Sequence, residues 1–500
     1  MTLYQRQINL LIICAIIASV IWSLYLPAKS LLLKSWTNIY LHGYNLPSDL
    51  TVRDIKNLDP AQAVPILMYH GVVSGGKLKS DSESNTERKV FIKQMETLKR
   101  EGFETISISE YDLFRQGKFT LPAKPIILTF DDGRRDSYYT TDKILEKLGF
   151  KATIFVASIK SNQKDPFYLD WEELKLMQST GRWEIEAHGQ RSHEEIPIDA
   201  DGTLGKFLTY RKYIPGVGLE SIADFEKRVE TDYVNHLYDL KSNLNIEATY
   251  FAIPLNDYGD AGESNYEGGR AFNELLTKRY FRLAFNQVYA PNGEPTESFY
   301  NYADSNPYEI KRLEVENISG EKLLRHLNHY APSTPDFGFP EVSGNKKDIN
   351  LLYGKYFINE SDLALESDEL VNSARILFGD TGWRNYSVVA NIERERGRSA
   401  SIIVYYTDEN NHVSMNWSGE AIRLIERLGG KERELAYYNI GDYGSGNMKV
   451  SVRGEVLSAY FNALTITSGV KINLKRGAVG FGVWDPSGAK SILKDIQIYE

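Results

Sequence analysis

Hydrophobic positions between Val64 and Ile253 alternate between short apolar runs and longer segments with helical spacing. Short apolar runs bounded by turns are typical of buried strands, and apolar positions three and four residues apart indicate helices. The predicted strands are 64–73, 125–130, 152–157, 183–187 and 249–253, and the predicted helices are 88–101, 136–148, 171–180 and 221–243. This alternation predicts an α/β domain, a distorted (β/α) barrel, over residues 62–330.

The pattern changes after residue 330. Residues 331–349 are rich in Pro, Gly and Ser, which is typical of a linker between domains. Beyond them, short segments of alternating polarity are separated by turns of Gly, Asn and Asp. Residues 350–500 are therefore predicted to form an all-β sandwich.

An uncharged apolar run lies near the N-terminus, from Ile8 to Leu26, and Arg6 precedes it. A helix needs ~20 apolar residues to cross a bilayer, and positive charge tends to stay on the cytoplasmic side. We therefore predict a cytoplasmic tip and transmembrane anchor over residues 1–27 and a juxtamembrane linker over 28–61. The bulk of the chain would be extracytoplasmic, in the periplasm or at the cell surface. A cleavable signal peptide and a buried globular helix remain as alternatives.

Composition narrows the classes of function. A chain of 500 residues usually forms more than one folded unit. Its net charge of -9 argues against a nucleic-acid binder, which would carry a basic face, and is compatible with a neutral glycan. The single cysteine, Cys14, lies in the N-terminal apolar run, so no intrachain disulfide and no multi-cysteine metal site can form. Any metal site must use His and carboxylate ligands.

Two adjacent carboxylates, Asp131 and Asp132, follow the predicted strand 125–130 in the sequence Thr-Phe-Asp-Asp-Gly. The ends of strands are where α/β folds assemble their sites. One carboxylate can bind a metal while the other acts as a base toward water. A solvated turn that only caps the next helix is the alternative.

Two histidines, His188 and His193, follow the predicted strand 183–187. A loop can bring two such imidazoles onto one ion, and with Asp132 they would form a site of two histidines and one carboxylate with open positions. Taken singly, either histidine is more simply a surface or capping residue. Their occurrence together with the Asp pair favours the metal site.

With this order and spacing, residues 64–327 resemble the polysaccharide deacetylase family, carbohydrate esterase family 4. The family motif T-F-D-D-G matches Thr129–Gly133, which implies that Asp131 is the general base and Asp132 a metal ligand. The family's histidine pair matches His188 and His193, which implies metal ligation by both. Their long spacing is similar to that in deacetylases of poly-N-acetylglucosamine exopolysaccharides.

Two further segments extend the resemblance. The sequence MYHGVV at 68–73 resembles the first strand of these enzymes and would place His70 at the mouth of the barrel. His70 is then either a substrate contact or a satisfied buried histidine. The segment at 170–174 resembles the one that precedes the histidine motif, and Trp171 within it is predicted to bind substrate.

The third motif of the family is altered. Residues 251–256, Phe-Ala-Ile-Pro-Leu-Asn, lack the Arg that orients the base and the Tyr beside it. A backbone N–H at Leu255 would still serve an oxyanion, because that role needs no side chain. The Leu-x-His motif, which supplies a general acid, has no clean match in residues 308–318. Its letters recur at Leu324–His326 in a predicted helix, so the proton donor is unassigned.

The resemblance implies a hydrolase of amide bonds that removes acetyl groups from an N-acetylhexosamine polysaccharide at the cell envelope. It implies a divalent cation, with Zn²⁺ expected, and exopolysaccharide synthesis or export machinery as candidate partners. Two alternatives remain: a catalytically degenerate glycan-binding protein, and a glycoside hydrolase, which needs two carboxylates across a glycosidic bond.

Residues 350–500 resemble, more loosely, concanavalin-like jelly-roll modules, which often bind sugars. Three aromatic side chains there, Tyr405, Trp417 and Trp484, would either stack on a sugar ring or fill the core of the sandwich.

Overall fold

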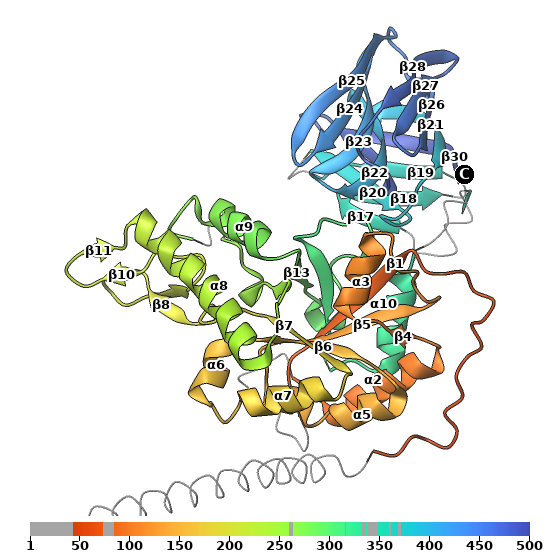
Figure 1. The fold of residues 1–500 in the computed structure, drawn as a ribbon. Helices are drawn as coiled ribbons and strands as arrows, with labels where there is room; N and C mark the ends of the chain where they lie inside the picture. Colours follow the sequence, from red (N-terminus) through yellow and green to blue (C-terminus); the bar gives the residue numbers. More distant parts are fainter. Residues whose placement is uncertain are drawn as a thin grey trace, which may run out of the picture. The chain divides into compact units, whose positions relative to one another are not determined.

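A computed structural model describes residues 44–73, 85–259, 264–315, 317–332, 337–338, 349–359, 362–368 and 372–500. The chain divides into two compact units, Met1–Asn328 and His329–Glu500 (Figure 1). The predicted transmembrane anchor lies outside the described residues, as does most of the predicted linker 331–349. Within the described ranges, no helix has both the length and the apolar character needed to span a membrane.

The first unit contains a closed barrel of parallel strands (Figure 1). The strands are β1 (Ala63–Tyr69), β5 (Pro125–Phe130), β6 (Ala152–Val156), β7 (Trp183–Ala187), β12 (Tyr250–Ala252), β13 (Leu283–Val288) and β15 (Ile310–Glu314). They pair in the order β1-β15-β13-β12-β7-β6-β5, and the parallel pairing of β5 with β1 closes the ring of seven. Two short strands extend the sheet, β14 (Tyr300–Tyr302) beside β1 and β4 (Glu104–Thr105) beside β5. The predicted distorted (β/α) barrel is therefore confirmed.

Helices lie between the strands of the barrel. They are α2 (Arg88–Arg100), α3 (Ile108–Arg115), α4 (Arg135–Tyr138), α5 (Asp142–Leu148), α6 (Ser158–Gln163), α7 (Trp171–Ser179), α8 (Ile222–Leu244), α9 (Gly269–Tyr280) and α10 (Gly320–Tyr330). The single helix predicted for residues 136–148 is wrong, because the chain forms α4 and α5 there. The Thr140 and Thr141 hydroxyls donate to the carbonyls of Asp136 and Ser137, and such side-chain bonds compete with helical ones.

A long insertion separates β7 from α8. It contains two small hairpins, β8 (Glu195–Pro197) with β9 (Leu204–Lys206) and β10 (Tyr213–Ile214) with β11 (Gly218–Leu219). The side chain of Ser221 then caps α8 by accepting the N–H of Asp224. The sequence pattern did not predict these hairpins, whose strands are only two or three residues long. Both His188 and His193 belong to this insertion, so its conformation determines their positions.

The second unit consists of two antiparallel sheets. One has the order β17 (Ile349–Tyr353), β20 (Ser373–Phe378), β29 (Ala478–Trp484), β22 (Ser399–Asp408), β23 (Asn411–Ser418), β24 (Ala421–Leu428), β25 (Lys431–Asn439). The other has the order β18 (Lys355–Asn359), β19 (Asp362–Glu366), β30 (Lys490–Tyr499), β21 (Tyr386–Arg396), β26 (Ser445–Arg453), β27 (Val456–Phe461), β28 (Leu464–Lys471), and β16 (Phe337–Gly338) pairs with β30. The prediction of an all-β unit is confirmed.

The aromatic residues of this unit separate into core and surface positions. Tyr405 and Trp417 are fully buried in the hydrophobic core, which excludes them as stacking platforms for a sugar. Trp484, at the end of β29, keeps 52% of its surface exposed. Of the three aromatic candidates, Trp484 alone is accessible to a ligand.

Candidate metal and catalytic site

The candidate residues lie at the carboxyl ends of the parallel strands. His70 follows β1, Asp131 and Asp132 follow β5, and His188 follows β7. Leu255 lies three residues beyond β12. Because parallel strands point the same way, their carboxyl ends meet at one end of the barrel. Four strands therefore deliver the candidate side chains to one place.

Asp132, His188 and His193 lie together, with one ligand atom from each within 4.8 Å of the others. The two histidine Nε2 atoms are 3.2 Å apart, and each lies 3.6 Å from Oδ1 of Asp132. A tetrahedral zinc ion about 2.0–2.1 Å from three donor atoms holds them about 3.3 Å apart. The three residues therefore fit a divalent metal ion. A fourth coordination position would remain for water or substrate.

The tautomer of His188 is fixed by a hydrogen bond. Its Nδ1–H donates to the carbonyl oxygen of Ala252 at 2.8 Å, which leaves the Nε2 lone pair directed at the cluster. Burial, with a smaller contribution from His188, lowers the pKa of His193 to about 3. The His193 imidazole is thereby kept neutral near pH 7, the form in which histidine binds metals.

The backbone turns sharply at Asp132. This residue has a φ of 72° and Gly133 has a φ of 73°, so both adopt the left-handed conformation. That conformation is strained for a residue with a side chain and is found at functional sites. A Cβ atom on Gly133 would lie 3.1 Å from Cγ1 of Val156, so the turn also needs glycine for space. The turn separates the directions of the two neighbouring carboxylates.

Asp131 forms a buried ion pair with Arg312 of β15. Arg312 Nη1 and Nη2 donate to Oδ1 and Oδ2 at 2.7 and 2.9 Å, and Nη1 also lies 3.2 Å from the Thr129 hydroxyl. Burial alone would raise the pKa of Asp131, but Arg312, followed by His188, holds this pKa well below its usual range. Asp131 is therefore ionised at neutral pH and fixed in orientation.

Arg312 provides a guanidinium beside Asp131, which residues 251–256 do not. Sequence reasoning did not predict this contact, because the Leu-x-His motif expected in residues 308–318 calls for a histidine. A signal was present, since an arginine in the middle of a strand that is buried on both faces needs a partner of opposite charge.

The segment after β12 presents a backbone donor. Leu255 has a φ of 57°, and its side chain is 45% exposed. Its N–H makes no hydrogen bond to any other described residue, whereas the next residue, Asn256, donates to the carbonyl of Ile253. Asn256 also accepts from the backbone N–H of Gln287 at 2.8 Å, which ties this turn to β13. The predicted oxyanion contact therefore has an available donor.

His70 contributes a third imidazole. Its Nδ1 is buried and has no hydrogen-bond partner among the described residues, which is not what a satisfied buried histidine would show. Burial raises the pKa of Asp132, but the imidazoles outweigh this effect and lower it, with His70 contributing more than His193 or His188. His70 therefore lies beside the three candidate ligands.

Two other candidates lie elsewhere. The Trp171 indole N–H donates to Oδ1 of Asn162 at 3.0 Å, and no contact joins Trp171 to the cluster within the described part of the chain. Tyr168, three residues earlier, is nearer, since burial and then Asp132 raise its pKa to about 12. His326 donates from Nε2 to the carbonyl of Gly293 at 2.8 Å, which assigns it to a structural contact.

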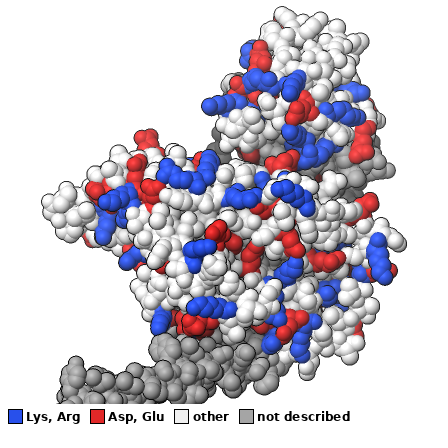
Figure 2. All heavy atoms as spheres, viewed as in Figure 1, with Lys and Arg blue, Asp and Glu red and all other residues white. Residues whose placement is uncertain are grey.

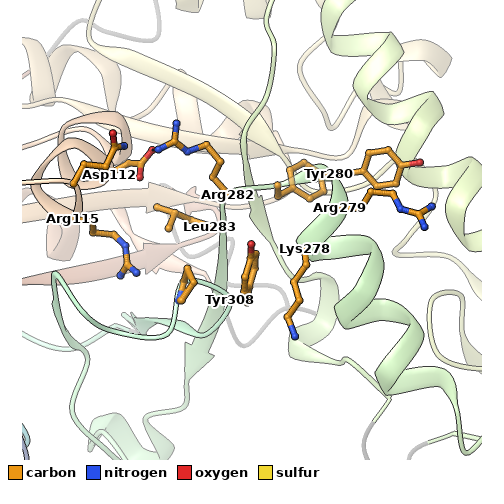
Figure 3. Close-up of a pocket in the computed structure, with 11 residues that line it drawn as sticks. Asp112, Arg115, Lys278, Arg279, Tyr280, Arg282, Leu283 and Tyr308 are labelled. Carbon is orange, nitrogen blue, oxygen red and sulfur yellow. The ribbon is translucent and has the colours of Figure 1, made fainter. Parts of the chain in front are cut away.

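A separate cavity of about 480 Å³ is formed by residues that include Asp112, Arg115, Lys278, Arg282 and Tyr308 (Figure 3). It adjoins Leu283, the first residue of β13, and therefore lies toward the amino ends of the strands, away from the metal cluster. Its cations are largely paired: Arg282 lies 2.9 Å from Asp112, and Lys278 lies 3.4 Å from Glu274.

Charges of both signs are interspersed over the face of the molecule that Figure 2 shows. No field of a single sign covers that face, as it would in a protein that binds a polyanion along this side. This charge distribution is compatible with a neutral polymer.

A (β/α) barrel with a His–His–Asp cluster and a neighbouring buried Asp–Arg pair at the carboxyl ends of its strands has the composition of a metal-dependent hydrolase site. Residues 118–264 match the family model "Polysaccharide deacetylase". The chain therefore contains a polysaccharide deacetylase domain.

Two curated relatives agree with this assignment. The chain is 34% identical over 134 residues to the "Putative polysaccharide deacetylase YxkH" of Bacillus subtilis (strain 168), covering 27% of this chain and 44% of the relative. It is 24% identical over 251 residues to the "Poly-beta-1,6-N-acetyl-D-glucosamine N-deacetylase" of Escherichia coli (strain K12), covering 47% of this chain and 36% of the relative. The chain thus spans less than half the length of either relative.

Two solved structures are similar to parts of the chain. A de-N-acetylase from Aggregatibacter actinomycetemcomitans has a TM-score of 0.45 at 17% identity and covers 53% of this chain and 100% of its own. The carbohydrate binding module CBM66 from Bacillus subtilis has a TM-score of 0.27 at 15% identity and covers 34% of this chain and 99% of its own.

Proposed function

We propose that this protein is a metal-dependent hydrolase that removes acetyl groups from the amide nitrogens of an N-acetylhexosamine polysaccharide. The observation that carries the proposal is the cluster of Asp132, His188 and His193, within 4.8 Å of one another and beside the ion pair of Asp131 with Arg312. The polysaccharide deacetylase domain in which they lie supports the same reaction class.

The three clustered residues would hold a divalent cation, and Zn²⁺ suits two imidazoles and one carboxylate. When bound, such a cation polarises a carbonyl group and lowers the pKa of water. Asp131 then accepts the proton of the attacking water, and Arg312 keeps its carboxylate ionised and correctly oriented. The resulting hydroxide attacks the acetamide carbon.

Two further groups complete the reaction. The free N–H of Leu255 donates to the carbonyl oxygen as negative charge develops on it. His70 donates a proton to the departing nitrogen, because it is the imidazole in the site that belongs to neither the ligand set nor the ion pair of Asp131. Acetate leaves, and the polymer gains a free amine.

The substrate class rests on two features. The five-residue separation of His188 and His193 is similar to that in exopolysaccharide deacetylases, and the Escherichia coli relative is named for poly-β-1,6-N-acetyl-D-glucosamine. We therefore propose a polymer of N-acetylglucosamine type, and exopolysaccharide synthesis or export machinery as the partner. Trp171, close in sequence to Tyr168, remains a proposed substrate contact.

The cellular arrangement is also a proposal. The apolar run from Ile8 to Leu26 supports a single-pass anchor with the bulk of the chain outside the cytoplasm, in the periplasm or at the cell surface. We further propose that residues 350–500 form a jelly-roll module that holds the polymer, with Trp484 on its accessible surface.

The test is acetate release from N-acetylglucosamine oligomers and from purified exopolysaccharide by the full chain, with and without a chelator. Asp131→Asn is assayed beside Asp201→Asn, a control at the exposed turn of the β8–β9 hairpin. We expect release that is lost with chelator and with Asp131→Asn and is retained in the control. Absence of release by folded, metal-loaded protein contradicts the proposal. An increase in reducing ends would favour a glycoside hydrolase instead, since deacetylation leaves chain length unchanged.

A further inference from the structure

The two candidate metal histidines are separated by a loop that must reverse direction. Residues 188 and 193 are five positions apart, and an extended chain of that length spans about 17 Å. Their Nε2 atoms nevertheless lie 3.2 Å apart. The intervening residues, Gly189 to Ser192, therefore need contacts that hold the reversal.

The carbonyl groups of this loop are held by the start of α6. The N–H of Ser158 donates to the carbonyl of Gly189 at 3.2 Å, and the N–H of Ile159 donates to that of Gln190 at 3.3 Å. These N–H groups are free at a helix start, where no intrahelical acceptor is available. One side of the loop is thus fixed by the barrel domain's own secondary structure.

The N–H groups of the loop are held by a single buried carboxylate, Asp232, in the middle of α8. Oδ1 of Asp232 accepts the N–H of Arg191 at 2.6 Å, and Oδ2 accepts the N–H of Gln190 at 3.1 Å. Oδ2 also accepts the hydroxyl of Ser192. Asp232 is 3% exposed, so these three donors reach it with little competition from water.

The fit between loop and carboxylate leaves no spare room. Gly189 has a φ of 78°, and a Cβ atom there would lie 1.9 Å from Oγ of Ser192 and 3.2 Å from Oδ2 of Asp232. The glycine is required both for the left-handed turn and for the close approach of the loop to α8.

We propose that Asp232 is a positioning residue for the metal site: its carboxylate holds the loop 189–192 in the conformation that brings His188 and His193 onto one ion. This inference rests on the proposed function, because Asp232 can position metal ligands only if the two histidines bind a metal. Among the described residues, the hydrogen bonds of Asp232 go to Gln190, Arg191 and Ser192 and not to the imidazole rings of the two histidines.

A carboxylate is needed at this position because all three incoming groups are donors. An asparagine keeps the shape of the side chain but replaces one acceptor oxygen with an NH₂ group, which would face an N–H or O–H donor. Asp232→Asn therefore perturbs the hydrogen bonds of the loop with the smallest change in volume.

Asp239, two turns further along α8, offers a matched control. Its Oδ2 accepts from the side chains of Ser158, Asn162 and Gln190, each at 2.8 Å. It contacts a side chain of the same loop but none of the loop's backbone N–H groups. Asp239→Asn makes the same chemical change on the same helix without releasing the backbone.

The experiment measures Zn²⁺ affinity of the full chain by competition with a chromophoric chelator, and the visible spectrum of the Co²⁺-substituted protein. We expect Asp232→Asn to weaken Zn²⁺ binding by about 10- to 100-fold, as loss of a group that orients metal ligands does. Its Co²⁺ spectrum should shift in band position or intensity. Asp239→Asn should bind Zn²⁺ within about twofold of the wild type, because its loop backbone is still held. Circular dichroism establishes that each variant is folded.

Ser192→Ala gives a second, milder variant in case Asp232→Asn does not fold. It removes one donor of the three and should weaken Zn²⁺ binding by about threefold, the scale of one hydrogen bond. Folded Asp232→Asn with wild-type affinity and a wild-type Co²⁺ spectrum overturns the inference. So does an unfolded Asp232→Asn together with a Ser192→Ala that binds as the wild type. If the wild type itself binds no metal, the proposed function fails and the inference fails with it.

Discussion

Two buried carboxylates in the barrel have opposite environments. Asp131, beyond β5, accepts two hydrogen bonds from the guanidinium of Arg312. Within the described part of the chain, Glu186 of β7 accepts the backbone N–H groups of Thr249 and Tyr250, at 3.1 and 3.0 Å, and it has Glu184 as its charged neighbour. The two side chains are equally inaccessible, since the residues are 3% and 5% exposed.

The environments shift the two pKa values in opposite directions. Burial raises the pKa of Glu186 well above its ordinary value, and Glu184 adds to the rise. Burial acts on Asp131 in the same sense, but the charge of Arg312 reverses the result. Burial alone therefore does not identify a catalytic carboxylate. A general base must be ionised when the substrate arrives, and the charge of Arg312 lets Asp131 meet that condition.

The largest expected effect is the loss of activity when the carboxylate of the Asp131–Arg312 pair is removed. Asp131→Asn should lower kcat/KM for acetate release by about 10²- to 10⁴-fold, the range for a lost general base. Glu186→Gln should retain wild-type turnover, because the hydrogen bonds of Glu186 go to the backbone N–H groups of Thr249 and Tyr250, at the start of β12. Steady-state kinetics on both variants checks this, and a comparable loss in the two would contradict the contrast.

Removing Arg312, the cation of the same pair, should lower the stability of the folded protein. Arg312→Met leaves Asp131 buried without its counter-charge and should reduce the free energy of unfolding by about 3–5 kcal/mol. The matched control is Arg279→Met, whose partner Glu230 lies 2.6 Å away; the two side chains of that pair are 53% and 37% exposed. That exposed pair should contribute about 1 kcal/mol or less. Urea unfolding of the two variants measures the difference, and equal losses would show that burial of the pair is immaterial.

Metal loading should stabilise the fold by a smaller amount. A ligand that binds only the native state at 100 times its Kd adds about 2.7 kcal/mol to the free energy of unfolding. Zn²⁺ should therefore raise the Tm of the wild type, and Asp132→Asn should show a reduced rise. A Tm that is insensitive to Zn²⁺ in the wild type would count against the cluster as a metal site.

The smallest effect concerns the pH dependence contributed by Glu186. Its folded-state pKa is raised above the unfolded value, so the unfolded state ionises first as pH increases. Stability due to this group is greatest below the unfolded pKa and falls as pH rises toward the folded pKa. Glu186→Gln should thus be less destabilising, or more stabilising, at pH 8 than at pH 5. Unfolding measured at both values tests the sign, and the reverse order would show that Glu186 is ionised in the native state.

Sequence reasoning succeeded where the information is local. The strands 125–130 and 183–187 were predicted with the bounds that the structure gives. The first appears as a nearly continuous apolar run, as a fully buried parallel strand does, and the second as an alternation of apolar residues with Glu184 and Glu186. The residues directly after these strands, Asp132 and His188, could then be placed at one end of the barrel. His193 required the further assumption that a loop bends back.

The contacts that were missed are non-local. Arg312 and Asp131 are 181 positions apart, and a single sequence carries no direct record of which strands become neighbours. The burial of Asp232 could not be predicted either, since a polar residue on a long amphipathic helix is usually exposed to solvent. The division of residues 136–148 into α4 and α5 depends on threonine hydroxyl bonds, which hydrophobic periodicity does not register.

Because the ring of strands is closed, residues from distant parts of the chain meet at the candidate site. β1 lies between β5 and β15 in the ring. Arg312 of β15 therefore reaches across β1 to Asp131, the residue that follows β5. The segment that matches the family, 118–264, contains Asp131 and the three candidate ligands but excludes both His70 and Arg312. That segment alone would therefore hold the three candidate ligands and Asp131, but neither the counter-charge of Asp131 nor His70, the proposed proton donor. Under the proposed function, activity requires residues from both ends of the first unit.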